Sequence, residues 1–287
     1  MFRLLLLFIL LSSASSAEPL YWTASKGGLK YTILGSIHVG DKSMYPLPKA
    51  VFSRLKNSHG LIIEADIRKT SGIKYPPITT KTKDVVDTHY YDELVGIANL
   101  LRLDIKNLLH SPPWSAALQL QMKQYEYLGY TAVDGVDIRI VDKATLWDIP
   151  VMGLESLQFQ IDLFTEQAQS GKELLLSTID EFDHSESTIH CLINSWKTGD
   201  LDKLEQFANI TKMPPDLHRA FLSERNLKWA NKLSESTWLP KRNGHYFVVV
   251  GMLHLLGEQS LLKLLESDGF RITQISKSSP SNCSFKY

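Results

Sequence analysis

Apolar residues along this chain form two alternating patterns, short uninterrupted runs and longer stretches in which they recur at helical spacing. Runs typical of buried strands lie at Tyr31 to Leu34, Leu61 to Ile67, Pro150 to Leu154, Tyr246 to Val250 and Phe270 to Ile275. Helical stretches separate most of these runs. The pattern therefore predicts an α/β fold, in which a mostly parallel or mixed central sheet is flanked by helices.

Helices are predicted where apolar residues recur at helical spacing after a start signal. Pro46 and Pro48 open the first helix, whose core-facing residues are Val51 and Leu55. Further helices are expected at Tyr91 to Leu101, Pro113 to Leu128, Asp137 to Trp147, throughout Glu155 to Leu233, and at Gly257 to Ser267.

Two regions differ from the regular alternation. The stretch from Arg68 to Thr88 carries a Pro-Pro pair and a cluster of Thr and Lys, and predicts a surface loop or flap without assigned chemistry. The helical block at about 156–235 is expected to cover the sheet or to form a lid. We expect residues 18–287 to form one domain of two related halves with this block inserted.

Two segments place a histidine directly after a predicted strand. The segments ILGSIHVG, from Ile33 to Gly40, and VVGMLHLLG, from Val249 to Gly257, each lead from an apolar run into Gly-x-x-His and a further glycine. Open α/β sheets bind ligands at the carboxyl ends of their strands, and an imidazole beyond a glycine turn faces that crevice. Either histidine alone also fits a turn residue bonded to backbone, but the repetition favours a functional role for His38 and His254.

Two glutamates occupy similar positions. Glu64 interrupts the apolar run LIIEADI, and Glu155 follows Gly153-Leu154 at the end of another run. A buried carboxylate is costly unless it is paired, hydrogen-bonded or bound to a metal, whereas a Glu64 that faces solvent at the strand's end is the simpler alternative. With His38 and His254, these acids make a plausible ligand set for Zn²⁺, Mn²⁺ or Co²⁺. A His and a Glu could also transfer protons without a metal.

Composition narrows the range of partners. The chain has 287 residues, 44% of them hydrophobic, which is enough for a large core. Its 31 basic and 31 acidic residues balance, so the charge favours neither a nucleic acid nor an anionic membrane as partner. After the N-terminal segment, no run approaches the length of a membrane span, and the substrate class stays open between polypeptide and small molecule.

The N-terminus has the pattern of an export signal. Arg3 precedes the apolar run Leu4 to Leu11, and Ser15 to Ala17 offers a small-residue cleavage site. We expect residues 1–17 to be removed and the mature chain to be periplasmic or secreted, with a retained anchor as the alternative. Export to an oxidising compartment would allow Cys191 and Cys283 to pair, although the sequence does not decide it, and two cysteines are too few for a zinc-thiolate site.

Several of these segments together resemble a known family, the TraB/GumN family, also called Tiki-like. The resemblance rests on Gly35-Ser36-Ile37-His38, Pro46-Leu47-Pro48, Glu64, Gly135-Val136-Asp137, Gly153-Leu154-Glu155-Ser156, Glu224-Arg225-Asn226 with Trp229, and Gly251-Met252-Leu253-His254-Leu255. For its animal proteases, the family implies a divalent-metal-dependent peptidase activity that needs both motif histidines and an acidic residue. It further suggests that Arg225 holds a site carboxylate or a substrate carbonyl oxygen. The alternative is that Arg225 forms a structural salt bridge to Asp137 or Glu155.

Two functions of different classes follow. The first is an exported metal-dependent hydrolase, acting on peptide bonds, in which His38 and His254 bind the metal, one of Glu64 and Glu155 completes the ligand set, and the other is the general base. The second is a non-catalytic periplasmic protein that binds a metal or haem, since the haem-binding ChaN-like proteins are distantly similar. A serine esterase is disfavoured because Ser36 and Ser260 lack the Gly-x-Ser-x-Gly elbow. The other histidines lack a repeated context and are assigned to the surface or to structural roles, namely His59, His89, His110, His184, His190, His218 and His245.

Overall fold

The fold is built on one six-stranded sheet. The computed structural model describes residues 17–210 and 213–285, so the predicted export signal lies almost entirely outside the described residues. The strands are β1 (Tyr21–Lys26), β2 (Leu29–Ser36), β3 (Leu61–Ile63), β4 (Val151–Gly153), β5 (His245–Gly251) and β6 (Arg271–Gln274). Their order across the sheet is β4-β3-β5-β2-β1-β6.

Four neighbouring strands of this sheet are parallel. β5 pairs with β2 on one side and with β3 on the other, and β3 pairs with β4, all in parallel register. β1 is antiparallel to β2, and β6 is antiparallel to β1. The predicted α/β fold with a mostly parallel or mixed sheet is therefore confirmed. The carboxyl ends of β2, β3, β4 and β5 meet at one edge, which is where a ligand site is expected in such a sheet.

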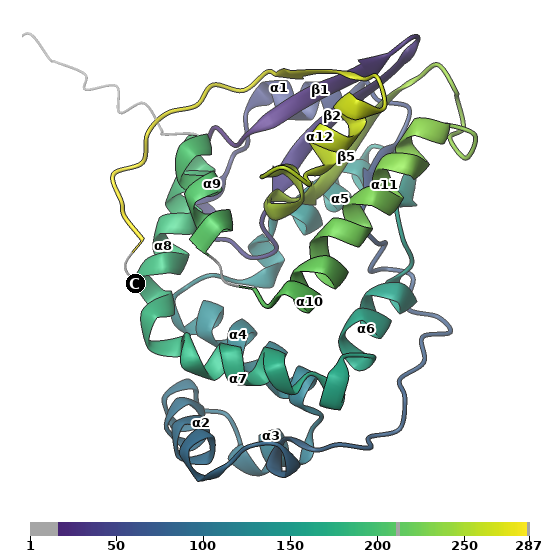
Figure 1. Ribbon diagram of the computed structural model, residues 1–287. Coiled ribbons are helices and arrows are strands. Elements are labelled where there is room, and N and C mark those ends of the chain that lie inside the picture. Colours follow the sequence, from purple (N-terminus) through teal and green to yellow (C-terminus); the bar gives the residue numbers. More distant parts are fainter. Residues whose placement is uncertain (1–16, 211–212, 286–287) are drawn as a thin grey trace, which may run out of the picture.

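Helices surround the sheet and extend beyond it (Figure 1). They are α1 (Lys49–Lys56), α2 (Thr88–Leu101), α3 (Ile105–His110), α4 (Pro113–Tyr127), α5 (Val136–Leu146), α6 (Leu157–Thr165), α7 (Lys172–Asp180), α8 (Phe182–Thr198), α9 (Leu201–Ile210), α10 (Pro215–His218), α11 (Glu224–Glu235) and α12 (Leu261–Ser267). A π-helical turn, Arg219–Ser223, joins α10 to α11. Val51 and Leu55 of α1 are fully buried, as predicted.

Two hydrophobic cores hold these elements. The larger core lies on the sheet, where Tyr246 to Val250 of β5 are fully buried. A second core, which includes Leu94, Ala98, Leu120 and Leu175, packs α2, α4 and α7 together. Figure 1 shows α2, α3, α4 and α7 gathered at the end of the molecule opposite the sheet. The helical layer therefore draws on α2 to α4 as well as on the predicted block at about 156–235.

Several element bounds differ from the sequence prediction. β1 was not predicted, because Thr23 and Ser25 interrupt its apolar pattern. The run from Leu61 to Ile67 is a strand only to Ile63, since Asp66 then forms a turn in which Lys69 N–H donates to its carbonyl. The last helix begins at Leu261 rather than Gly257, because the Ser260 side chain caps it.

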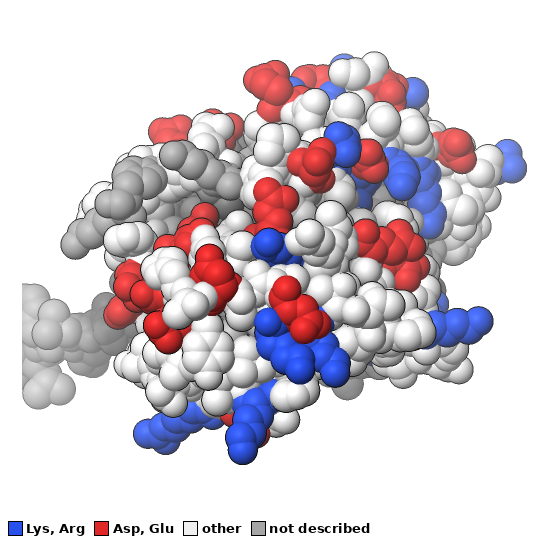
Figure 2. Space-filling view, turned by 60° about the horizontal axis from the view of Figure 1, so that its bottom comes forward, with Lys and Arg blue, Asp and Glu red and all other residues white. Residues whose placement is uncertain are grey.

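The stretch from Arg68 to Thr88, predicted as a surface loop or flap, is a largely exposed loop. Between Arg68 and Thr88 the chain has no strand and only one short 3₁₀ turn, Thr82–Asp84. Figure 2 shows that positive and negative side chains are interspersed on the face turned forward, as expected from a chain with balanced charge.

A disulfide fastens the C-terminal segment of the described chain. Cys191 of α8 is bonded to Cys283, with their Cα atoms 5.5 Å apart, so the C-terminal segment is fastened to that helix. Within residues 17–210 and 213–285, no helix combines the length and apolar character needed to cross a membrane.

Candidate active site at the carboxyl edge of the sheet

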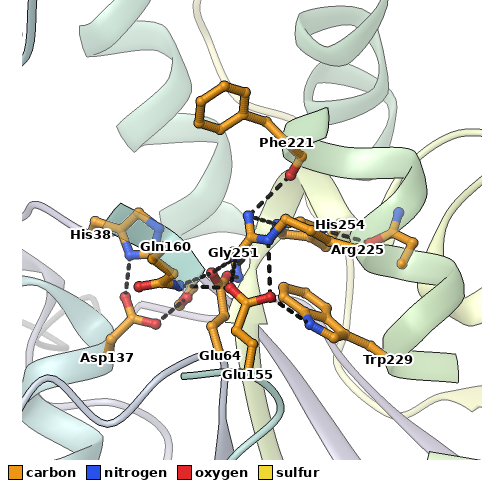
Figure 3. Close-up of polar contacts among 12 residues, drawn as sticks. His38, Glu64, Asp137, Glu155, Gln160, Phe221, Arg225, Trp229, Gly251 and His254 are labelled. Atoms are coloured by element: carbon orange, nitrogen blue, oxygen red, sulfur yellow. Dashed lines mark hydrogen bonds and ion pairs between the residues drawn. The ribbon is translucent and has the colours of Figure 1, made fainter. Parts of the chain in front are cut away.

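The four residues predicted from strand ends lie at one edge of the sheet. His38 follows β2, Glu64 follows β3, Glu155 follows β4 and His254 follows β5. Figure 3 shows that their side chains point toward one another, together with that of Arg225 from α11. The structure therefore brings all five predicted site residues into one group.

Gly251, the last residue of β5, leaves room at the centre of this group. A methyl group placed on Gly251 would lie 3.3 Å from Glu64 Oε1, 3.6 Å from His254 Cδ2 and 3.7 Å from His38 Nε2. Both imidazole rings and one carboxylate oxygen thus surround the same position. The backbone N–H of Gly251 also donates to Glu64 Oε1 over 2.7 Å, which holds that oxygen against the strand end.

Arg225 is the buried cation of the site. Its Nη2 donates to Glu64 Oε2 and to Glu155 Oε1, in each case over 2.6 Å, and all three side chains are less than a tenth exposed. Nη1 donates to the carbonyl of Phe221 in the π-helical turn, which fixes the guanidinium from the other side. Arg225 was expected either to hold a site carboxylate or to form a structural salt bridge to Asp137 or Glu155. The structure combines these roles, because Arg225 binds both Glu64 and Glu155.

Glu155 has no oxygen free for further chemistry. Its Oε1 accepts from Arg225 and from Gln160, and its Oε2 accepts from Arg225 and from the indole N–H of Trp229 at 2.9 Å. Each oxygen therefore receives two hydrogen bonds, which is the usual capacity of a carboxylate oxygen. Glu155 consequently fixes Arg225 rather than facing the histidines.

Glu64 differs from Glu155 in that one of its oxygens faces a histidine. Among the described residues, Oε1 accepts a hydrogen bond only from Gly251, and it lies 3.8 Å from His254 Nε2. Burial alone would raise the pKa of Glu64, but its interactions with His254, with His38 and with the Arg225 guanidinium, together with the Gly251 N–H, outweigh burial and lower the pKa to about 2. Glu64 is therefore a carboxylate at any physiological pH.

His254 is held as a neutral ring whose unprotonated nitrogen faces Arg225. Its Nδ1 lies 2.6 Å from the amide oxygen of Asn226, and because that oxygen only accepts, Nδ1 carries the ring proton. Nε2 is then the bare nitrogen and accepts from Arg225 Nη1 at 3.2 Å. Burial lowers the pKa of His254 to about 3, which keeps the ring neutral.

His38 lies at the open side of the site. Its Nδ1 is 2.9 Å from Asp137 Oδ2, and the Ser36 hydroxyl donates to the other oxygen of Asp137 over 2.7 Å. The charge of Asp137 raises the pKa of His38 to about 9. Because the His38 side chain is 69% exposed, surrounding water screens part of this attraction. The carboxylate orients the ring so that Nε2 faces the space above Gly251.

Five side chains of this network were not among the predicted site residues: Ser36, Asp137, Gln160, Asn226 and Trp229. Asp137 belongs to the Gly135-Val136-Asp137 motif. Asn226 directly follows Arg225 and Trp229 lies four residues after it, so the sequence motifs pointed to these three residues. No motif in the sequence pointed to Gln160 of α6. Its partners, Glu64 and Glu155, become its neighbours only when α6 packs over the strand ends.

The side chains of the site include donor atoms of the types that bind divalent metals. Metal-binding histidines usually give their second ring nitrogen to an acceptor, and here Asp137 and Asn226 hold Nδ1 of His38 and His254. Both remaining ring edges, with Glu64 Oε1, border the space above Gly251. Within the described part of the chain, no three His, Cys, Asp or Glu side chains are already gathered as a ligand set, and Arg225 now bonds His254 Nε2.

Comparison with known proteins gives a consistent assignment. The chain is 29% identical to the Uncharacterized protein YbaP of Escherichia coli (strain K12), over 83% of this chain and 89% of the relative. It is also 29% identical to the Uncharacterized protein YbaP of Shigella flexneri, over 81% and 86%. No solved structure matches it. The sequence profile of the TraB/PrgY/gumN family matches residues 20–274, which contain every site residue described above, and the chain belongs to this family.

Proposed function

We propose that this protein is a metal-dependent hydrolase that cleaves peptide bonds. The observation that carries the proposal is the space above Gly251, which is bordered by His38 Nε2, the edge of the His254 ring and Glu64 Oε1. Two imidazoles and one glutamate are the protein ligands of a common class of catalytic zinc sites, which keep one position open for water or substrate.

His38, His254 and Glu64 are the proposed ligands, and the ion is Zn²⁺, Mn²⁺ or Co²⁺. When bound, such an ion polarises a carbonyl oxygen and makes water more acidic. In hydrolysis, the water oxygen bonds to the carbonyl carbon, the C–N bond breaks, and the departing amine takes a proton. The exposed side of His38 is where solvent and a substrate can reach the ligands.

The remaining residues position these ligands. Asp137 and Asn226 fix the orientation of the two imidazoles, and Arg225 keeps Glu64 ionised. Glu155, with both oxygens saturated, anchors Arg225. We therefore assign Glu155 a positioning role, and choose Glu64 as the carboxylate that completes the ligand set.

The alternative of a haem-binding protein is less favoured. Haem requires a flat apolar slot, whereas the edge of the sheet presents two carboxylates and a guanidinium within hydrogen-bonding distance of one another. A protein that binds a metal without turning over a substrate would use the same ligands, and the assay below separates it from a hydrolase.

We further propose that the protein works in the periplasm or outside the cell. The export pattern before Glu18 and the Cys191–Cys283 disulfide support this, because disulfides persist in oxidising compartments. N-terminal sequencing of the protein isolated from the periplasmic or medium fraction should begin at Glu18. A chain that begins at Met1 and stays with the membrane would favour a retained anchor.

Metal analysis coupled to a peptidase screen tests the function. The purified mature chain should contain or take up one of the three ions, and should cleave peptides in an assay that chelator abolishes and added metal restores. His38→Ala and His254→Ala should lose both metal and activity, while His110→Ala, an exposed histidine on α3, should keep both. A metal-binding chain that cleaves none of a broad set of peptides would support the binding protein instead.

A further inference from the structure

A strongly basic loop lies beside the candidate active site. Residues 67–83, here called the basic loop, contain five cations and no acid, although the whole chain has no net charge. The cations are Arg68, Lys69, Lys74, Lys81 and Lys83. Most of the loop is without secondary structure and exposed, so its lysines face solvent rather than the core.

A groove of about 830 Å³ runs between the basic loop and the site. Its lining includes Lys69 and Lys74 of the loop, Lys232 of α11, and Glu155, whose carboxylate binds Arg225. The groove therefore opens directly onto the hydrogen-bond network that holds Glu64. A chain lying in it would pass beside Glu155, whose partner Arg225 also binds Glu64.

The acidic groups of the groove are already paired with arginines. Asp66 accepts from Arg68 Nε at 2.7 Å and from Arg68 Nη2 at 2.9 Å, while Glu155 is saturated by its own partners. Lys69 Nζ stays 3.8 Å from Asp66, beyond hydrogen-bonding distance. Three lysines and two acids line the groove, so the net charge of its lining is positive.

The walls of the groove are held in a fixed relation to the site. The side-chain amide of Gln158 accepts from the backbone N–H of Lys74 at 2.8 Å and donates to its carbonyl at 2.9 Å, which fastens the basic loop to α6. Gln160 on the same helix donates to Glu64 and Glu155. Lys232 Nζ donates to the carbonyls of Gly153 and Leu154, so it too is anchored at the strand end.

We propose that this groove binds an acidic stretch of a polypeptide substrate, with Lys69, Lys74 and Lys232 facing its carboxylates. This rests on the proposed function in so far as the bound polypeptide is the one hydrolysed. A groove with fixed walls and a surplus of positive charge, bordered by Glu155, selects an extended acidic segment. Basic segments are rejected there by like charge.

Peptide binding measured without turnover tests the groove. Fluorescence anisotropy would compare labelled peptides of equal length, rich in Glu, Gln or Lys, on the mature chain in the presence of chelator. We expect the Glu-rich peptide to bind at least about tenfold more tightly than the Lys-rich one, and added salt to weaken it. Equal affinity for the three peptides would overturn the proposal.

Charge reversal assigns that preference to the groove. The double variant Lys69→Glu, Lys74→Glu should lower the affinity for the Glu-rich peptide by about tenfold, since two attractive pairs become repulsive. Lys263→Glu, an exposed control on α12, should change it by less than about twofold, and an unchanged melting temperature would show that both variants fold. An equal effect of the control would overturn the proposal.

The binding and cleavage assays together distinguish the two proposals. Selective peptide binding without cleavage would refute the proposed hydrolase alone, whereas cleavage without a charge preference would refute only the proposal for the groove.

Discussion

A single nitrogen of Arg225 donates to Glu64 and to Glu155, and both hydrogen bonds are 2.6 Å long. Two carboxylates this close would repel one another strongly in a buried site, and the guanidinium between them offsets that repulsion. The ends of β3 and β4 are therefore joined electrostatically through a helix that is far away in sequence.

Removal of this cation should destabilise the fold. Arg225→Met leaves two buried carboxylates without compensation, and we expect the free energy of unfolding at neutral pH to fall by about 3–5 kcal/mol. Urea denaturation measures it, with Arg271→Met on the exposed edge strand β6 as the matched control. A loss no larger than that of the control would show that the carboxylates are held by other groups.

Glu64→Gln should separate metal binding from folding. The amide is nearly the same shape as the carboxylate and Glu155 still compensates Arg225, so the variant should fold, while its metal affinity should drop by at least about tenfold and its hydrolysis should disappear. Isothermal titration with Zn²⁺ or Mn²⁺ measures the affinity. Wild-type metal binding in Glu64→Gln would remove Glu64 from the ligand set.

The acid limb of the stability curve should carry a contribution from Glu64. Its pKa in the folded protein is about 2, below the ordinary value of 4.5, so its stabilisation is present above pH 4.5 and is lost as the pH falls toward 2. In Glu64→Gln this part of the acid dependence should be missing. Superimposable losses of stability in wild type and variant over that range would contradict the low pKa.

Asp137→Asn should change the titration of His38. In the metal-free protein the folded pKa of about 9 lies above the ordinary value of 6.5, so His38 stabilises the fold fully below pH 6.5 and this contribution is lost as the pH rises through 9. Without the charge of Asp137, the pKa should move back toward 6.5, as followed by the ring protons in NMR. Metal binding to wild type should strengthen with pH up to about 9, because the imidazole must lose its proton first. An unaltered His38 titration in Asp137→Asn would refute the pairing.

Loss of the disulfide should lower stability without affecting the site. The bond between Cys191 and Cys283 closes a separation of 92 residues, and the double Cys→Ser variant should lose about 2–5 kcal/mol. Reductant should lower the melting temperature of wild type and leave that of the variant unchanged. If reductant acts equally on both, the cysteines are not paired in solution.

The positions of the principal site residues could be predicted from local sequence. His38 and His254 follow apolar runs through a Gly-x-x-His turn, and the parallel strands of the structure bring those turns to one edge. Glu64 and Glu155 were located by the same reasoning, since a carboxylate at the end of a buried strand is costly unless it is paired, hydrogen-bonded or bound to a metal. Periodicity and glycine turns are properties of neighbouring residues, which is why the sequence determined them.

Only the tertiary structure decided the partner of each side chain. Arg225 and Glu64 are 161 positions apart, and His38 and Asp137 are 99 apart, so no local pattern relates them. The same holds for the pairing of Cys191 with Cys283 and for the saturation of Glu155, which leaves Glu64 to face the histidines. Hydrogen bonds and ion pairs depend on ångström-scale distances that are set when helices pack on the sheet, so they emerge only from the complete fold.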